Sequence, residues 1–197
     1  NYRTKVINVM IGNDIVDLQL AKTQSNWQRK GFLEKQFTEE EQKMILISKN
    51  PFAQVWLFWS MKEAAYKSFT QEIKKRFFAP QKFKCTLINE NEGLVVFEDK
   101  KFYTNTFLSV FYLYTIAKET QEQIAIFSAI GAPKTIDIAL KKKLTEETGI
   151  LSEEIEKRKT FIGAPLFYHQ KQLLTQSCSI SHHGNYGAFA FTLENES

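Results

Sequence analysis

One helical segment constrains this chain more than any other feature. Residues 53–69 carry apolar side chains around most of the helix circumference: Val55, Trp56, Phe58, Trp59, Met61, Ala64, Ala65 and Phe69. A helix that is apolar on most sides is buried inside a protein. The 197 residues of the chain are enough to build a core around such a helix.

The remaining pattern places helices early and strands late. A helix is predicted over residues 32–47, where Thr38 precedes three glutamates in the manner of a helix start. A buried strand is predicted at 6–11, and Pro51 marks a boundary. Three antiparallel strands follow at 83–88, 94–97 and 106–117, with closing strands at 166–168, 177–180 and 186–193.

Two segments are less specific. Residues 124–130 fit either a strand or a buried helix, and residues 135–159 are predicted as a helix interrupted near Gly149. No internal repeat or low-complexity linker is visible. The predicted class is α+β, an antiparallel sheet packed against helices in a single domain over residues 1–197.

Composition excludes several classes of protein. An apolar fraction of 43% with 17 Phe indicates a folded chain rather than a disordered one. The net charge of +4 comes from short, scattered basic clusters, which suit solvated surface or an acidic partner better than nucleic acid. Two cysteines outside any C-x-x-C pair, no apolar run of roughly 18–20 residues and no signal peptide favour a reduced, cytoplasmic protein without a membrane span.

Three polar segments suggest chemistry. In Gly12–Leu18 (GNDIVDL), Asp14 and Asp17 are spaced i and i+3. They could direct two carboxylates at one Mg²⁺, or one of them could cap the following turn.

The second segment, WSMKEAAYK, lies in the apolar helix. Its Glu63 and Lys67 share one helical face at i and i+4. They form either a surface ion pair or, in a half-buried setting, a metal ligand and a phosphate-neutralising cation. The third segment, SISHHGNYGAFA, offers Ser181 and His182 as donors to a phosphate, or as ordinary satisfied polar residues.

Taken together and in this order, the three segments resemble the 4'-phosphopantetheinyl transferases. Members of that superfamily carry G-x-D-I-V-x-[IL], W/F-[ST/A]-x-K-E-A-x-x-K and S-x-S-H-x-x-x-Y-A-x-A. The Ser-His segment stands last, as in the short, holo-acyl-carrier-protein-synthase type. The chain is longer than that type, which places an insertion within residues 100–159.

The resemblance implies a reaction and a set of roles. The reaction is Mg²⁺-dependent transfer of 4'-phosphopantetheine from coenzyme A to a serine of an acidic apo acyl or peptidyl carrier protein. Asp14 and Glu63 would bind Mg²⁺, with Asp17 nearby. Glu63 or a metal-bound water would be the base. Lys62 and Lys67 would face the coenzyme A phosphates, with Lys67 stabilising the transition state, and Ser181 and His182 would bind the 3'-phosphate.

The resemblance also implies partners. The Ser-His segment of one subunit is expected to meet the metal site of its neighbour, which gives a homotrimer with shared sites. Arg29, Lys30 and Lys35, on or before the first predicted helix, are expected to contribute to docking of the acidic carrier. Two other functions stay open: a catalytically inactive carrier-binding module of the same fold, and a small basic nucleic-acid-binding protein.

Overall fold

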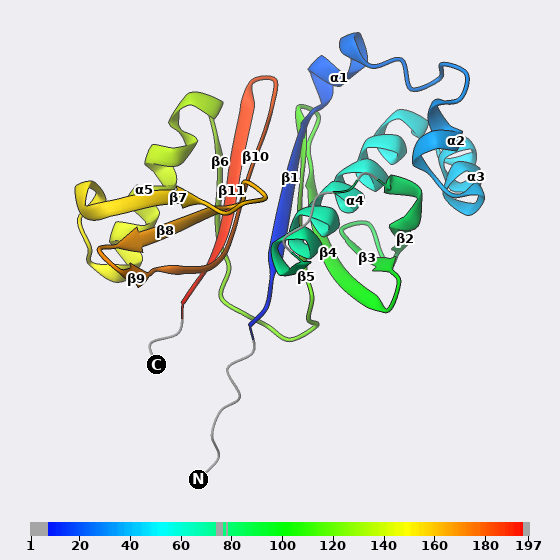
Figure 1. Cartoon of the computed structure of the whole chain (residues 1–197). Helices are drawn as coiled ribbons and strands as arrows, with labels where there is room; N and C mark the ends of the chain where they lie inside the picture. Colours follow the sequence, from blue (N-terminus) through cyan, green and yellow to red (C-terminus); the bar gives the residue numbers. More distant parts are fainter. Residues whose placement is uncertain (1–7, 74–76, 78, 195–197) are drawn as a thin grey trace.

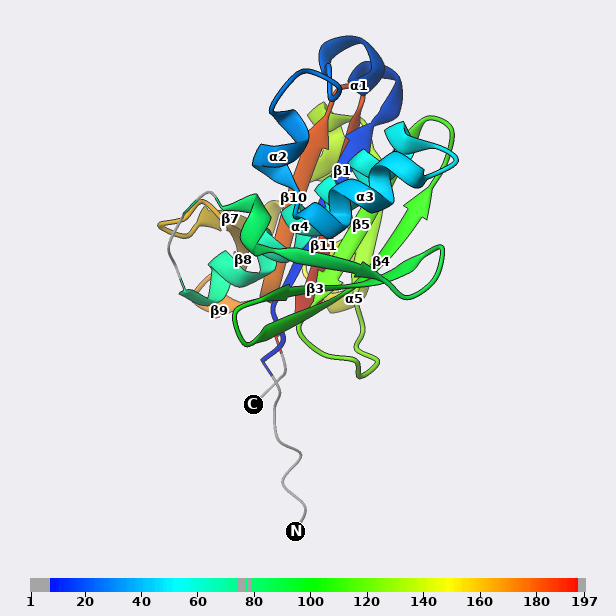
Figure 2. The same ribbon diagram turned by 90° about the vertical axis from the view of Figure 1, so that its right-hand side faces the viewer.

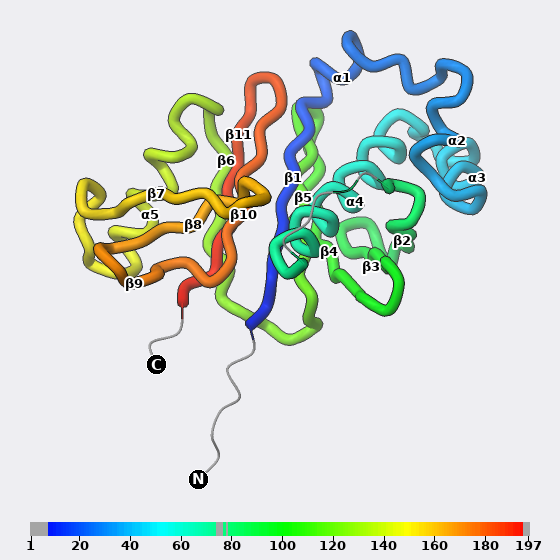
Figure 3. The backbone as a smooth tube through the Cα atoms, in the orientation of Figure 1, coloured from blue at the N-terminus to red at the C-terminus, as the bar shows by residue number. Residues whose placement is uncertain are grey.

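The computed structural model describes residues 8–73, 77 and 79–194. Figure 1 shows two halves side by side, with helices α1–α4 and strands β1–β5 in the first and helix α5 with strands β6–β11 in the second. Strands β1 and β10 run along the boundary between the halves (Figure 3). No helix in the described ranges is both long and apolar enough to cross a bilayer.

The first half begins with a strand and four helices: β1 (Ile11–Asp17), α1 (Leu18–Gln24), α2 (Phe32–Gln36), α3 (Glu39–Ile47) and α4 (Pro51–Ile73). A short 3-10 turn, η1 (Pro80–Lys82), leads into four strands: β2 (Lys84–Leu87), β3 (Glu92–Phe97), β4 (Lys100–Leu108) and β5 (Tyr112–Lys118). Strand β1 joins the edge of these strands, so the antiparallel sheet has the order β1-β5-β4-β3-β2. Figure 2 turns this half toward the viewer.

The second half is smaller. Its elements are β6 (Phe127–Gly131), η2 (Pro133–Thr135), α5 (Ile136–Thr148), η3 (Ser152–Glu154), β7 (Ile155–Lys159), β8 (Pro165–His169), β9 (Gln172–Leu173), β10 (Thr175–His183) and β11 (Tyr186–Leu193). They form two antiparallel sheets, β10-β11-β6 and β7-β8-β9. The predicted α+β class, an antiparallel sheet against helices, is confirmed.

Helix α4 is the buried element that the sequence predicts, although it extends beyond 53–69 at both ends. Its apolar residues form the largest core cluster together with the inner face of the first sheet. Strand β1 packs so closely on α4 that a Cβ at Gly12 would collide with the carbonyl oxygen of Ala64. Gly12 therefore allows the close approach of the strand that carries Asp14.

The predicted strand at 6–11 is wrong in position. Residues 6 and 7 lie outside the described part of the chain, and β1 starts only at Ile11. The polar motif is itself the strand, because α4 covers one face and β10 with β11 covers the other, which buries all seven residues. Asn13 and Asp14 look like loop residues in the sequence, yet each finds a partner inside this layer.

Other boundaries also differ. The helix predicted at 32–47 is two helices, α2 and α3, because Phe37 is extended and Thr38 starts α3 with a full capping box. Four strands, not three, occupy residues 84–118. Residues 127–131 are a strand, which decides between the two alternatives for 124–130. Gly149, at a φ of 74°, ends α5, and residues 155–159 form β7 rather than a helix because they pair with β8.

The two halves share a plan that the sequence does not reveal. In each half the first strand pairs antiparallel with the last one, β1 with β5 and β6 with β11, and a helix packs on that pair. Residues 100–159 are divided between the halves: β4 and β5 complete the first sheet, while β6, α5 and β7 belong to the second half.

Candidate active site

Asp14 is the centre of a charged cluster under α4. Its side chain faces the helix, and Lys67 Nζ lies 3.0 Å from Asp14 Oδ1 and 2.9 Å from the Asn13 carbonyl oxygen. Burial raises the pKa of Asp14, and the Lys67 charge opposes this rise only in part. The pKa of Asp14 therefore stays above its usual value beside the lysine, and a further cation would oppose that rise.

Glu63 completes this cluster. It lies one helical turn before Lys67 on α4, so both side chains leave the same face. Burial, and secondly the nearby Asp14 charge, raise the pKa of Glu63 to about 7, while Lys67 lowers it. The structure thus brings together Asp14, Glu63 and Lys67.

Asp17 lies apart from that cluster. Residues three apart in a strand point to opposite faces, and the Asp17 side chain turns away from α4 to cap α1. Its Oδ1 accepts from the N–H groups of Gln19 (3.1 Å) and Leu20 (2.9 Å), and its Oδ2 accepts from Asn185 N–H (3.1 Å). Burial alone would raise the pKa of Asp17, but these backbone donors hold it below its usual value.

The Ser-His strand, β10, lies against β1 of the same chain. Ser179 Oγ accepts from Asn13 N–H at 3.0 Å and donates to Asn13 Oδ1 at 2.7 Å. At the end of the strand, His183 Nδ1 accepts from Asp17 N–H at 2.9 Å. The Ser-His segment therefore meets the Asp14 motif within one chain, without the neighbouring subunit that the sequence analysis expected to supply it.

Ser181 and His182 point to opposite sides of β10. Ser181 is buried toward β1, and within the described residues its Oγ has no hydrogen-bond partner. His182 is exposed on the other face. A single phosphate cannot sit against both side chains as they stand.

Two adjoining cavities, together called the groove, run from the space between the halves into the second half. The first, of about 300 Å³, is lined by Tyr66 and Lys67 of α4 and by Ser179 of β10. The second, of about 370 Å³, contains His182 and three lysines: Lys134, Lys157 and Lys159. Gly163, Pro165 and Ile180 line both cavities, so the two cavities are neighbours.

A sequence model of the 4'-phosphopantetheinyl transferase superfamily matches residues 10–127, which include Asp14, Glu63 and Lys67. The chain belongs to this superfamily. Its enzyme class is accordingly phosphopantetheinyl transferase. Among solved structures, the Thermotoga maritima holo-[acyl-carrier-protein] synthase is similar at a TM-score of 0.44 and 10% identity, over 81% of this chain and 83% of that one. No curated protein matches the chain.

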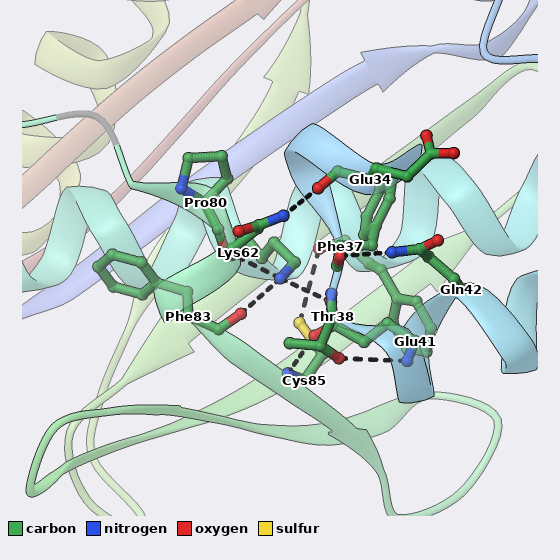
Figure 4. Close-up of polar contacts among 11 residues, drawn as sticks. Glu34, Phe37, Thr38, Glu41, Gln42, Lys62, Pro80, Phe83 and Cys85 are labelled. Atoms are coloured by element: carbon green, nitrogen blue, oxygen red, sulfur yellow. Dashed lines mark hydrogen bonds and ion pairs between the residues drawn. The ribbon is translucent and has the colours of Figure 1, made fainter. Parts of the chain in front are cut away.

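Lys62 of the transferase does not line the groove. Its ammonium nitrogen is 2.8 Å from Glu41 Oε2, and it donates to the carbonyl oxygens of Pro80 (2.9 Å) and Phe83 (2.6 Å), as Figure 4 shows. These bonds use all three of its hydrogens. This geometry does not favour the expectation that Lys62 faces coenzyme A, because the side chain points to α3 and the start of β2.

Sequence reasoning missed several residues of the transferase that join its halves. Gln71 donates to the Ile11 carbonyl oxygen (2.8 Å) and accepts from Ser177 Oγ (2.8 Å). His183, which the sequence analysis does not single out, accepts from Asp17 N–H at the end of β1. The alternation of Ser177, Ser179, Ser181 and His183 along one strand is a signal that they share a face.

Proposed function

We propose that this transferase moves 4'-phosphopantetheine from coenzyme A to a serine of an acidic apo carrier protein in a Mg²⁺-dependent reaction, releasing 3',5'-ADP. The observation that carries the proposal is the cluster of Asp14, Glu63 and Lys67, whose Lys67 side lines the groove.

The cluster suits Mg²⁺. Mg²⁺ in phosphoryl-transfer sites is held by one or two carboxylates together with substrate phosphates and water. Asp14 and Glu63 come from different elements, both have raised pKa values, and a divalent cation would favour the charged form of both. No group of three or more His, Cys, Asp or Glu residues that could hold a metal is present in the described ranges. Asp17 is not included, because its carboxylate is bonded to backbone N–H groups.

The groove suits an elongated, polyanionic substrate. Lys67 lines one cavity, while Lys134, Lys159 and His182 line the next. Lys157 is paired with Asp137 at 2.6 Å, whereas Lys134 and Lys159 form no ion pair within the described residues. We assign the pyrophosphate of coenzyme A to the Lys67 end and its 3'-phosphate to the His182 end. Ser181, buried against β1, is left out of this assignment.

The chain's residues would divide the chemistry between them. The metal ion, when bound, supplies charge neutralisation at the pyrophosphate. Glu63, or a metal-bound water, would take the proton of the carrier serine hydroxyl as the serine oxygen bonds to the β-phosphorus. Lys67 stabilises negative charge as the bond from that phosphorus to the leaving 3',5'-ADP breaks.

We further infer that one chain forms a complete site. The predicted homotrimer rested on the need for a neighbouring Ser-His strand, and β10 of the same chain meets β1. Asp14→Ala and His182→Ala proteins, unfolded together and refolded as a mixture, are therefore expected to stay inactive while wild type regains activity. Recovery of transfer in the mixture would restore the shared-site trimer.

The test of the function is mass spectrometry of apo carriers after incubation with the protein, coenzyme A and Mg²⁺. A gain of one phosphopantetheine, with release of 3',5'-ADP, supports the proposal. Carrier binding without either product would indicate the inactive module instead. Nucleic-acid binding that falls steeply with salt and ignores metal would indicate the remaining alternative.

A further inference from the structure

Lys62 is a buried charge whose bonds all go to protein. Its side chain is 3% exposed and that of its partner Glu41 is 2% exposed. Its Nζ also lies 5.5 Å from the centroid of the Phe37 ring. A side chain with three bonded hydrogens and almost no exposed surface has no donor left for a substrate phosphate.

Glu41 is equally committed. Its Oε2 accepts from Thr38 N–H (2.9 Å) in the capping box of α3, and its Oε1 accepts from Cys85 N–H (2.7 Å) at the start of β2. Figure 4 shows these bonds converging from the start of α3, the middle of α4 and the segment from Pro80 to Cys85. The Lys62–Glu41 pair therefore fixes three separate segments to one another.

The same pair supports the wall beside the proposed catalytic carboxylate. Glu63 follows Lys62 on α4, so the two side chains leave the helix about 100° apart. A cavity of about 20 Å³ next to Glu63 is lined by Lys62, Tyr66, Pro80 and Phe83, among other residues. The carbonyl oxygens of Pro80 and Phe83 are the ones that Lys62 holds.

We propose that Lys62 is a positioning residue: through Glu41, Pro80 and Phe83 it fixes the rotation of α4 and the wall beside Glu63, and it does not contact coenzyme A. This inference rests on the proposed function, because the position of Glu63 matters only if Glu63 acts in transfer. The inference gives two lysines of one motif different roles: Lys62 positions the helix, and Lys67 contacts the substrate.

The test is a double-mutant cycle of Lys62→Met and Glu41→Gln, measured in folded protein below the lowest Tm. Either single change leaves a buried charge without its partner, whereas the double variant leaves none. We expect each single variant to lower Tm by roughly 10 °C. We expect kcat to fall about 10- to 100-fold, with the KM for coenzyme A within about twofold of wild type. The double variant should recover part of both losses.

Two controls accompany the cycle. Lys84→Met removes an exposed lysine at the start of β2 and should leave kcat and KM unchanged. Lys67→Met removes a lysine that lines the groove, and its loss should appear in the KM for coenzyme A as well as in kcat.

Several outcomes would overturn the inference. A tenfold rise in the KM for coenzyme A that the double variant does not reverse would make Lys62 a phosphate ligand. An unchanged kcat in folded Lys62→Met, with only Tm lowered, would make the pair purely structural. If the single variants do not fold, the double variant decides, since a tenfold higher KM for coenzyme A there contradicts the proposal and a wild-type KM supports it. If wild type transfers phosphopantetheine but the variants give one of these contrary results, only this inference fails. If wild type transfers no phosphopantetheine, the proposed function fails as well.

Discussion

Helix α4 carries two lysine–carboxylate pairs, five residues apart, that resemble each other in distance and differ in setting. Lys62 lies 2.8 Å from Glu41, and Lys67 lies 3.0 Å from Asp14. The first pair is 3% and 2% exposed, whereas the second is 29% and 12% exposed and borders the groove. Distance alone therefore does not separate a structural pair from a functional one.

The difference lies in what each pair has left to bind. Every hydrogen of the Lys62 ammonium and both oxygens of Glu41 are bonded within the protein. Within the described residues, Lys67 bonds to Asp14 and Asn13, which leaves its third hydrogen available. The Lys62–Glu41 pair, whose bonds all stay within the protein, holds segments of the fold together. The Lys67–Asp14 pair keeps, in the described part of the chain, a free hydrogen on Lys67 beside the groove and can bind a substrate.

The largest loss of activity should come from removing the carboxylate of Asp14 or Glu63. Asp14→Asn or Glu63→Gln should lower kcat by roughly 10²–10³-fold or more, because each removes negative charge that would hold Mg²⁺. Tm should stay the same or rise, since each change removes a desolvated carboxylate. Steady-state transfer assays at saturating Mg²⁺, with thermal melts, measure both. Transfer at the wild-type rate by either variant would rule out this metal site.

Asp17 lies in the same motif as Asp14, but its replacement should lower stability rather than impair the metal site. Asp17→Ala removes the cap of α1 and the contact with Asn185 N–H, so stability should fall by about 1–2 kcal/mol. In folded protein, the Mg²⁺ concentration for half-maximal transfer should stay that of wild type. A large rise in that concentration would return Asp17 to the metal site.

The different settings of Asp14 and Asp17 show which features of the site the sequence could predict. Helical periodicity located α4, and residue order located the three motifs, because both signals depend only on residues that are close together in the sequence. The pairing of β1 with β5 joins residues 95 to 107 positions apart, and the contact of β1 with β10 joins residues 166 positions apart. Periodicity does not encode either. Without that pairing, Asp14 and Asp17 look like two ligands in a loop rather than opposite faces of a strand. The sequence does not reveal the setting of Lys62 for a similar reason, since its partners come from other segments.

Glu63 should make the stability of the metal-free protein depend on pH. Its pKa is about 7 in the folded protein and 4.5 in the unfolded chain. Between these values the folded state keeps a proton that the unfolded state has lost, so stability decreases as pH rises toward 7. The raised pKa of Asp14 acts in the same direction.

Thermal melts from pH 4.5 to 8 in a metal chelator measure this effect. Glu63→Gln should flatten the decrease, and Mg²⁺ added to wild type above pH 7 should raise Tm again. A decrease that persists unchanged in Glu63→Gln would place the titrating group elsewhere.

The smallest effect should come from surface charges that belong to neither pair. Arg29, Lys30 and Lys35 are exposed, the first two between α1 and α2 and the third on α2. Reversing them to Glu should raise the KM for an acidic carrier severalfold at low salt, through a slower association rate, and leave the KM for coenzyme A unchanged. The difference should shrink at ionic strengths above roughly 0.1 M, where the screening length is about 10 Å. Lys171→Glu, an exposed change in the second half, is the matched control. Equal carrier KM values for the triple variant, the control and wild type at low salt would show that the carrier docks on another surface.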